Sequence, residues 1–169
     1  MVKAITLQSL QDDFKAQNYR DVIQGCKSLL EKETNLLECD LLLASALILS
    51  KEYLESKDAY LGIIKKYQQF SSDVYYNLSS AYLNLYNYKD SLFYARQYVN
   101  HNTNSLMGYL RLGELYSALG LAGERKMSYM MALSLDPENF AALKGLSETF
   151  RVESDSEGAL KYLIQQKKT

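Results

Sequence analysis

The sequence predicts an all-α fold built from pairs of helices that repeat along the chain. Between residues 72 and 150, three kinds of residue recur every 34 positions. They are a leucine, a small residue and an aromatic residue: Leu78, Leu112 and Leu146, then Ser79, Gly113 and Ser147, then Tyr82, Tyr116 and Phe150. A period of this length and order is typical of repeats with two helices each. The 169 residues include one proline and eight glycines, which leaves few obligatory breaks between helices.

Composition excludes several classes of function. Hydrophobic residues make up 47% of the chain, which is ordinary for a globular core. The formal net charge is -1, and a nucleic-acid or membrane surface needs clustered lysine and arginine, so we expect no nucleic-acid partner. The longest apolar run, Leu41 to Leu49, is interrupted by Ser45 and is too short to cross a bilayer. We therefore also expect no membrane insertion.

The two cysteines, Cys26 and Cys39, lack the spacing of metal ligands and fall in apolar contexts. Free cysteine in such a context behaves as a small hydrophobic residue. We expect no metal, no cofactor and a reducing compartment, so that the protein is intracellular and cytoplasmic. The first residues lack a basic region followed by a long apolar run, and we expect no signal peptide.

The first predicted unit rests on one apolar face. Leu7, Leu10 and Phe14 lie at helical spacing, and Asn18 marks the start of a second helix, because its short polar side chain can cap free amide groups. The spacing from Phe14 to Tyr19 is one residue shorter than in later units, which predicts a tighter first turn. The whole chain, residues 1–169, is predicted to be a single array with units at about 3–36, 37–71, 72–105, 106–139 and 140–169.

Helix ends are predicted in the next two units. Lys65 and Lys66 end the second helix of unit 37–71, where cations oppose the negative end of the helix dipole. Ser71 or Ser72 caps the first helix of the following unit, and Asn87 opens its second helix.

The last two units carry clearer signals for turns and helix ends. Gly120 is predicted at the turn between two helices, where a left-handed backbone favours glycine. Asp136 and Pro137 are predicted to cap the next helix, with the proline at the first helical position. Ser154 and Glu157 are predicted to form a capping box before the last helix.

Residues 106–139 resemble the tetratricopeptide repeat. The family pattern has a large aromatic residue, Leu-Gly, Tyr, then later an aromatic residue, alanine and proline. It is matched here by Tyr109, Leu112, Gly113, Tyr116, Tyr129, Ala132 and Pro137. Arg125 departs from the pattern at a position where the family has a small residue, and Thr103 and Gln68 replace the proline in earlier units.

This resemblance implies a right-handed superhelical solenoid of about five antiparallel helix pairs, or about ten helices. Each pair packs only on its neighbours. It also implies a concave groove, lined mainly by first helices, and a non-catalytic scaffold that binds a peptide or helix of another protein there.

Helical phase predicts which side chains face that groove. The packing residues of each first helix face the core, and the opposite positions face the groove. The groove is expected to be apolar at one end and mixed in charge at the other. The candidates are Leu41, Leu42, Ser45 and Leu49, then Tyr76, Asn77, Ser80 and Asn84, then Leu110, Arg111, Glu114 and Ser117, then Lys144, Glu148 and Arg151. The alternative reading is that these residues are only solvated helix faces.

Some tetratricopeptide domains hold the acidic C-terminus of heat-shock chaperones with lysines, asparagines and an arginine. Asn77 and Arg111 match two of the five clamp positions, and the other three are Leu41, Ser45 and Met107. The two lysines of the clamp are missing, because Leu41 and Met107 stand in their places. We therefore expect no tight binding of such a tail.

The last helix suggests self-association. Its apolar residues have no predicted helix behind them, so we expect either a second copy or a further domain to cover them. These residues are Leu160, Tyr162, Leu163 and Ile164.

Three other functions are possible alternatives to the scaffold. An enzyme is not expected, because His101 is the only histidine and the sequence holds no metal cluster or phosphate-binding loop. If catalysis is involved, it would lie in a larger protein for which this segment is a docking or oligomerisation domain. A repeat that reads RNA would need a positive groove, and a self-assembling structural array would need adhesive ends.

Overall fold

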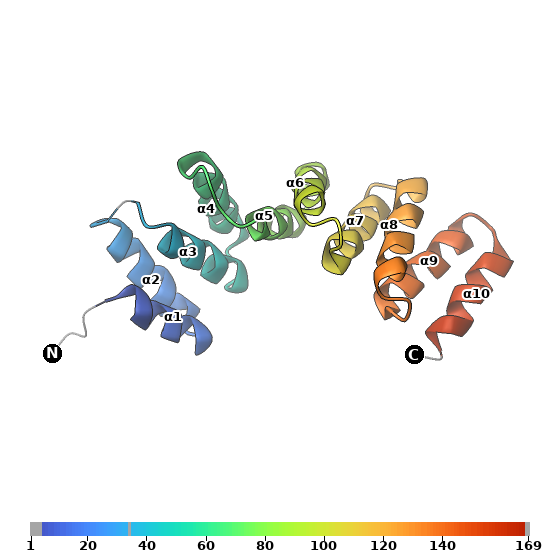
Figure 1. The fold of residues 1–169 in the computed structure, drawn as a ribbon, viewed down its shortest axis with the longest axis horizontal. Helices are drawn as coiled ribbons and strands as arrows, with labels where there is room; N and C mark the ends of the chain where they lie inside the picture. Colours follow the sequence, from blue (N-terminus) through green and yellow to red (C-terminus); the bar gives the residue numbers. More distant parts are fainter. Residues whose placement is uncertain (1–4, 34, 168–169) are drawn as a thin grey trace. The chain divides into compact units, whose positions relative to one another are not determined.

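The computed structural model describes residues 5–33 and 35–167, and the described part of the chain is helical throughout, without a strand (Figure 1). The all-α prediction is therefore confirmed. The ten helices in this part are Leu7–Lys15 (α1), Tyr19–Leu30 (α2), Leu37–Leu49 (α3), Tyr53–Lys66 (α4), Asp73–Asn84 (α5), Tyr88–His101 (α6), Leu106–Ala118 (α7), Ala122–Leu135 (α8), Phe140–Val152 (α9) and Ser156–Gln166 (α10).

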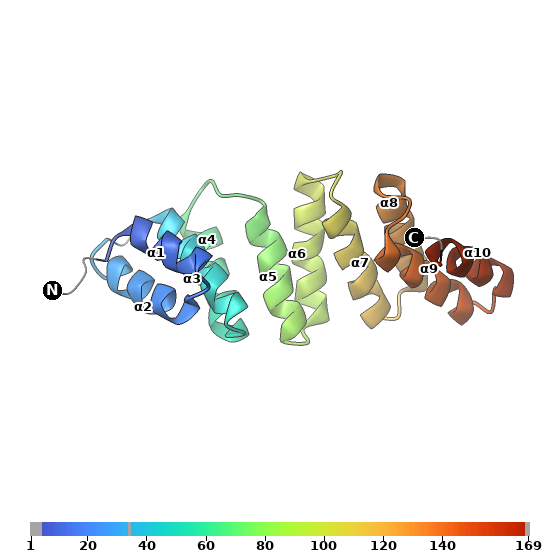
Figure 2. The ribbon, with the colours of Figure 1, turned by 90° about the horizontal axis from the view of Figure 1, so that it is seen from below.

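The helices group into two compact units, which meet in the sequence between Asn87 and Tyr88. In the first unit, α3 packs against α2 and α4 and also contacts α1 and α5. In the second unit, α7 packs against α6 and α8 and also contacts α9, and α10 packs against α9. Figure 2 shows the antiparallel hairpins α1–α2 and α3–α4 in the first unit and α7–α8 and α9–α10 in the second.

A turn of three residues follows every first helix, and its middle residue has a positive φ. These residues are Gln17 (63°), Lys51 (65°), Tyr86 (58°), Gly120 (72°) and Ser154 (60°). The residue after it donates its amide to a carbonyl in the last turn of the helix, as Glu52 does to Leu47 at 2.9 Å. This is the Schellman arrangement, which satisfies free carbonyls at a helix end.

The predicted tighter first turn is wrong. Residues 16–18 form a turn of the same length as the others. The Asn18 amide donates to the Asp13 carbonyl at 2.9 Å, which is the same closing bond as in the later turns. The short spacing from Phe14 to Tyr19 reflects a shift of one residue in the packing position of the aromatic ring, not a shorter loop.

Helix starts differ in detail from the predictions. The helix after Pro137 begins at Phe140, and Asn139 caps it by accepting from the Ala142 amide at 3.1 Å. The last helix is capped by Asp155, which accepts from the Gly158 amide at 2.9 Å. The predicted caps at Asp136 and Pro137 and at Ser154 are therefore wrong, because Asp136 still closes the end of α8 and Ser154 is the left-handed turn residue.

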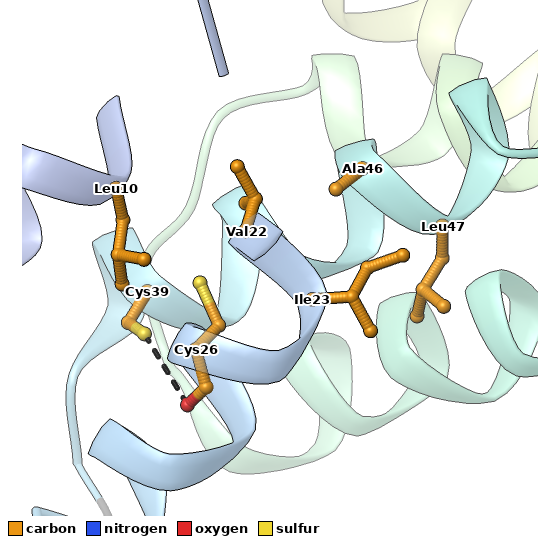
Figure 3. Close-up of a cluster of buried hydrophobic side chains, with 7 residues drawn as sticks. All are labelled: Leu10, Val22, Ile23, Cys26, Cys39, Ala46 and Leu47. Carbon is orange, nitrogen blue, oxygen red and sulfur yellow. Dashed lines mark hydrogen bonds between the residues drawn. The ribbon is translucent and has the colours of Figure 1, made fainter. Parts of the chain in front are cut away.

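A cluster of buried side chains joins α1, α2 and α3. Figure 3 shows its members, Leu10, Val22, Ile23, Cys26, Cys39, Ala46 and Leu47. The two cysteines are free and buried, and the Cys39 thiol lies 3.8 Å from the Cys26 carbonyl oxygen. Burial is the main cause that raises the pKa of the Cys26 thiol, which keeps it protonated. Both cysteines pack as small hydrophobic residues, as predicted.

Candidate peptide-binding face

First helices and second helices form separate layers within each unit. Helix α3 contacts both α1 and α5 in the first unit, and α7 contacts α9 in the second. We call the side formed by these first helices the inner face. The outer face is the side formed by α2 and α4 in the first unit, and by α6, α8 and α10 in the second. None of the predicted groove residues is buried in the core.

A tyrosine from a second helix organises the inner face of the first unit. Tyr60 of α4 is fully buried, and its hydroxyl lies 3.1 Å from Ser45 Oγ of α3. Asn77 of α5 also forms a hydrogen bond with this hydroxyl. Burial raises the pKa of Tyr60, and these two hydrogen bonds oppose that rise. Two predicted groove residues, from α3 and α5, are thus brought together by a side chain that was not predicted to face the groove.

The remaining predicted residues of the first unit are uncharged. Leu41, Leu42 and Tyr76 are half-buried, and Leu42 packs against the core cluster of α1–α3. The Ser80 hydroxyl donates to the Tyr76 carbonyl at 3.0 Å, and the Asn84 amide donates to the Ser80 carbonyl at 2.8 Å. This inner face therefore offers apolar contacts and neutral hydrogen-bonding groups.

Tyr129 is the counterpart of Tyr60 in the second unit. Each lies nine residues after a left-handed turn residue, Gly120 for Tyr129 and Lys51 for Tyr60. The ring of Tyr129 passes between two glycines. A Cβ atom would lie 2.5 Å from the ring if added at Gly113 of α7, and 2.3 Å from it if added at Gly145 of α9. The glycines therefore let the ring reach the inner face between α7 and α9.

Charged groups surround the Tyr129 hydroxyl. Burial is the main cause that raises its pKa; Glu114 of α7 and Glu148 of α9 raise it further, and Arg125 opposes them. The hydroxyl consequently stays protonated and can donate a hydrogen bond. Within the described residues, the structure gives this hydroxyl no hydrogen-bond partner, whereas the Tyr60 hydroxyl has two.

The charges on this inner face are paired along their own helices. Arg111 Nε lies 3.4 Å from Glu114, and Lys144 Nζ lies 4.0 Å from Glu148. Leu110 is half-buried, and Ser117 and Arg151 are exposed. The Ser117 hydroxyl accepts from Arg125 at 3.3 Å, while the buried Nε of Arg125 has no partner in the described part of the chain. Lys144 and Glu148 are both exposed, and an exposed pair of this kind contributes little to stability and can be exchanged for contacts with a bound protein. The Arg111 side chain is largely covered.

Tyr60 and Tyr129 were not predicted to reach the inner face, because helical phase was applied only to first helices. A signal was present: both are large aromatic residues at the same distance from the turn, and the equivalent positions in α2 and α6 are the small residues Cys26 and Ala95. A large ring at this position has to extend past the small residues of the neighbouring first helix.

The outer face of the second unit is apolar near α8. A hollow of about 210 Å³ is lined by Tyr109, Tyr116, Met127 and Met131, together with Glu124 and Ser128. Met127 and Met131 are exposed there. Arg96 donates to the Tyr116 hydroxyl at 3.1 Å and covers one edge. This face serves as a comparison surface for tests of the inner face.

The four residues predicted for self-association are divided by the fold. Leu160, Leu163 and Ile164 lie exposed on α10. Tyr162 instead stacks on Phe150 of α9, with ring centroids 5.5 Å apart, and contributes to the packing of α9 on α10.

Within residues 5–33 and 35–167, no group of three or more His, Cys, Asp or Glu side chains is placed to hold a metal ion. No helix in the same part combines the length and the apolar character needed to cross a membrane.

Comparison with known proteins places the fold. No family model matches the chain. The chain is 30% identical over 109 residues to heat shock protein STI1 of Saccharomyces cerevisiae; this match takes in 64% of the chain and 18% of STI1. The matched part of the chain thus spans less than a fifth of that protein.

Two solved structures are similar over nearly the whole chain. MamA of Desulfovibrio magneticus RS-1 has a TM-score of 0.89 at 17% identity, covering 95% of this chain and 90% of that one. YrrB, described as a TPR protein with an unusual peptide-binding site, has a TM-score of 0.84 at 17% identity, covering 95% and 82%. The chain therefore has the tetratricopeptide-repeat fold, as residues 106–139 predicted.

Proposed function

We propose that the chain is a non-catalytic scaffold whose inner faces bind a peptide or helix of another protein. The observation that carries the proposal is the Tyr129 hydroxyl. It reaches the inner face between α7 and α9, stays protonated and has no partner in the described part of the chain. A donor in this position can bind the backbone carbonyl of a guest chain.

The two inner faces suit different parts of a guest. The first unit presents leucines and neutral groups, with its tyrosine hydroxyl already bonded to Ser45 and Asn77. The second presents two opposite-charge pairs around Tyr129. We infer that the first unit favours a guest segment with apolar side chains, and that the second favours a segment with polar or charged groups. This mixture of charges also supports the expectation of a protein partner and not a nucleic acid.

The fold of YrrB supports the proposal, since that protein is described as having a peptide-binding site. The sole histidine, His101, supports the absence of catalysis: its ring bonds to the Gln97 carbonyl at 2.8 Å on an exposed helix end. The free, buried thiols of Cys26 and Cys39 support an intracellular, cytoplasmic location, where thiols stay reduced.

Peptide selection followed by calorimetry tests the proposal. A random peptide library is panned on the immobilised chain, and the selected peptide is titrated against variants. Tyr129→Phe removes one hydrogen bond from the inner face, and we expect affinity to fall about fivefold to tenfold, which corresponds to about 1 kcal/mol. The matched substitution Tyr60→Phe is expected to leave affinity within about twofold, because that hydroxyl is already bonded inside the protein.

Met127→Ala provides the outer-face control, and it is expected to have no effect. Binding that is lost with Met127→Ala and unchanged in both tyrosine variants would place the site on the outer face and refute the proposal.

A further inference from the structure

The last helix exposes a surface that two earlier second helices, α2 and α6, keep covered. Leu160 lies six residues after its turn residue, as Ile23 and Leu92 do after theirs. Ile23 is 7% exposed and Leu92 8% exposed, whereas Leu160 is 56% exposed. Helix α3 packs on α2, and α7 packs on α6, so in each case the next first helix provides the cover.

Leu163 repeats the pattern at the position of Cys26, Tyr60 and Ala95. Those three side chains are buried, and Leu163 is exposed. The surface of α10 around Leu160 and Leu163 therefore has the composition of a helix–helix contact without a helix on it in the described part of the chain. Burying an exposed leucine of this kind is favourable.

The charges on α10 select the direction of a pairing helix. Glu157, Leu160, Ile164 and Lys167 follow one another at steps of three, four and three residues, so they share one face. All four are exposed. The acidic residue lies near the start of the helix and the basic residue just after its end. Two antiparallel copies of this face bring opposite charges together, and two parallel copies bring like charges together.

A two-fold axis near residue 162 satisfies both the apolar and the charged positions. Leu160 then lies opposite Ile164 of the second copy, and Glu157 lies opposite Lys167 of the second copy. Leu163 lies at one edge of this face, on the opposite edge from Lys161, so the two-fold axis brings it beside Leu163 of the second copy. Tyr162, which packs on Phe150, stays out of the contact.

A head-to-tail contact, with α1 of one copy on α10 of another, is unfavourable. Five residues before the turn residue, α3, α5, α7 and α9 carry the fully buried residues Ala46, Ala81, Leu115 and Thr149. At this position α1 carries Asp12, whose side chain is 64% exposed. Docking α1 on Leu160 would bury that carboxylate against apolar surface, which is strongly unfavourable unless the carboxylate is paired.

We propose that α10 pairs with α10 of a second copy of the chain, antiparallel and about a two-fold axis. The surface is small, so association is weak and belongs to the range of hundreds of micromolar. Helix α10 belongs to the outer face, so the dimer leaves the inner faces of both copies open to a partner that has several binding segments.

Sedimentation velocity on the 169-residue chain, from about 10 µM to 1 mM, tests the pairing. We expect the weight-average mass to rise toward that of a dimer. Ile164→Asp is expected to keep the chain monomeric throughout. Met130→Asp is the matched control, since Met130 occupies the equivalent position on α8 and is 51% exposed against 48% for Ile164; it is expected to dimerise like the parent chain.

Charge exchange tests the register independently of folding. Glu157→Lys alone and Lys167→Glu alone are each expected to weaken dimerisation at least threefold, because like charges then face each other. A mixture of the two single variants is expected to form a heterodimer, since each unlike pair is restored. Circular dichroism confirms that each variant is folded.

A parent chain that stays monomeric at 1 mM would overturn the proposal. Dimerisation that Ile164→Asp leaves unchanged would also overturn it. A mixture of charge variants no more associated than either alone would overturn the antiparallel register.

Discussion

Turn residues show how single positions fix the repeat. Five turns use a residue in the left-handed region, and four of these residues are not glycine: Gln17, Lys51, Tyr86 and Ser154. A side chain in this region costs on the order of 1 kcal/mol relative to glycine. The cost is tolerated because each turn closes a hydrogen bond back to the helix, such as that from Leu121 to Tyr116 at 2.9 Å.

Opposite substitutions at two turns should have opposite effects. Lys51→Gly relieves the left-handed strain, and we expect the free energy of unfolding to rise by about 0.5–1 kcal/mol. Gly120→Ala introduces the strain, and we expect a fall of about 1 kcal/mol. A Cβ at Gly120 has open space around it, so the effect is one of backbone conformation alone. Urea denaturation measures both changes. A free energy of unfolding that Gly120→Ala leaves unchanged would contradict the explanation.

The two residues that match the chaperone-tail clamp are already engaged. Asn77 bonds to Tyr60, and Arg111 pairs with Glu114. A peptide ending in Glu-Glu-Val-Asp would have to displace these partners without the two missing cations. We expect calorimetry to show no binding tighter than about 1 mM. Low-micromolar binding that Arg111→Ala removes would show that the pairs on the inner face open more readily than the contacts indicate.

At the scale of residues, the sequence predicted a position correctly where the backbone conformation there favours one residue type. Gly120 was predicted at the turn because of its backbone freedom, and its φ is 72°. Tyr129 was identified as a repeat position, but its route between Gly113 and Gly145 depends on three helices at once. Periodicity along one helix does not show which residues of a neighbouring helix make room for a side chain.

At the scale of helices, the period was predictable and the ends were not. The step of 34 residues comes from apolar packing, which leaves a strong pattern in the sequence. Several short polar residues compete for each cap. Asp136 and Asn139 both lie before α9, and the end of α8 decides between them: the Asp136 amide still bonds to the Ala132 carbonyl at 2.9 Å. The cap therefore moves to Asn139, which starts the new helix.

Helix packing in the second unit should depend on Gly145. A Cβ there meets the Tyr129 ring, and Gly113 blocks the ring from moving away on the other side. We expect Gly145→Ala to lower the free energy of unfolding by about 2–3 kcal/mol, because the packed contact has no free space. Gly62→Ala, on an open side of α4, is the matched control and should stabilise by up to about 1 kcal/mol. Equal effects in thermal denaturation would mean that the ring is not confined.

At the scale of the whole molecule, the two units should respond separately to damage. Each helix packs mainly on its neighbours along the chain, so loss of stability spreads locally. Leu47 is buried in the cluster of α1–α3, and Leu47→Ala should cost about 2–5 kcal/mol there. We expect hydrogen exchange to accelerate in α1–α4 and to stay unchanged in α8–α10. Uniform acceleration would indicate a single cooperative fold.

The division after Asn87 could not be read from the sequence. The predicted units follow the sequence period, and they put α5 and α6 in the same unit. The compact units follow the density of contacts, and they put α5 in the first unit and α6 in the second. A repeat pattern specifies what each helix packs against locally, but not how strongly neighbouring repeats hold together. The single array over residues 1–169 stays a prediction.

Mapping a selected peptide by NMR chemical shifts tests most directly whether the inner faces bind. Titration into the isotope-labelled chain should shift signals of Arg111, Glu114, Tyr129 and Lys144, and leave Met127 and Met131 unchanged. Shifts confined to Met127 and Met131 on the outer face of α8, with the inner face unmoved, would contradict the proposed function.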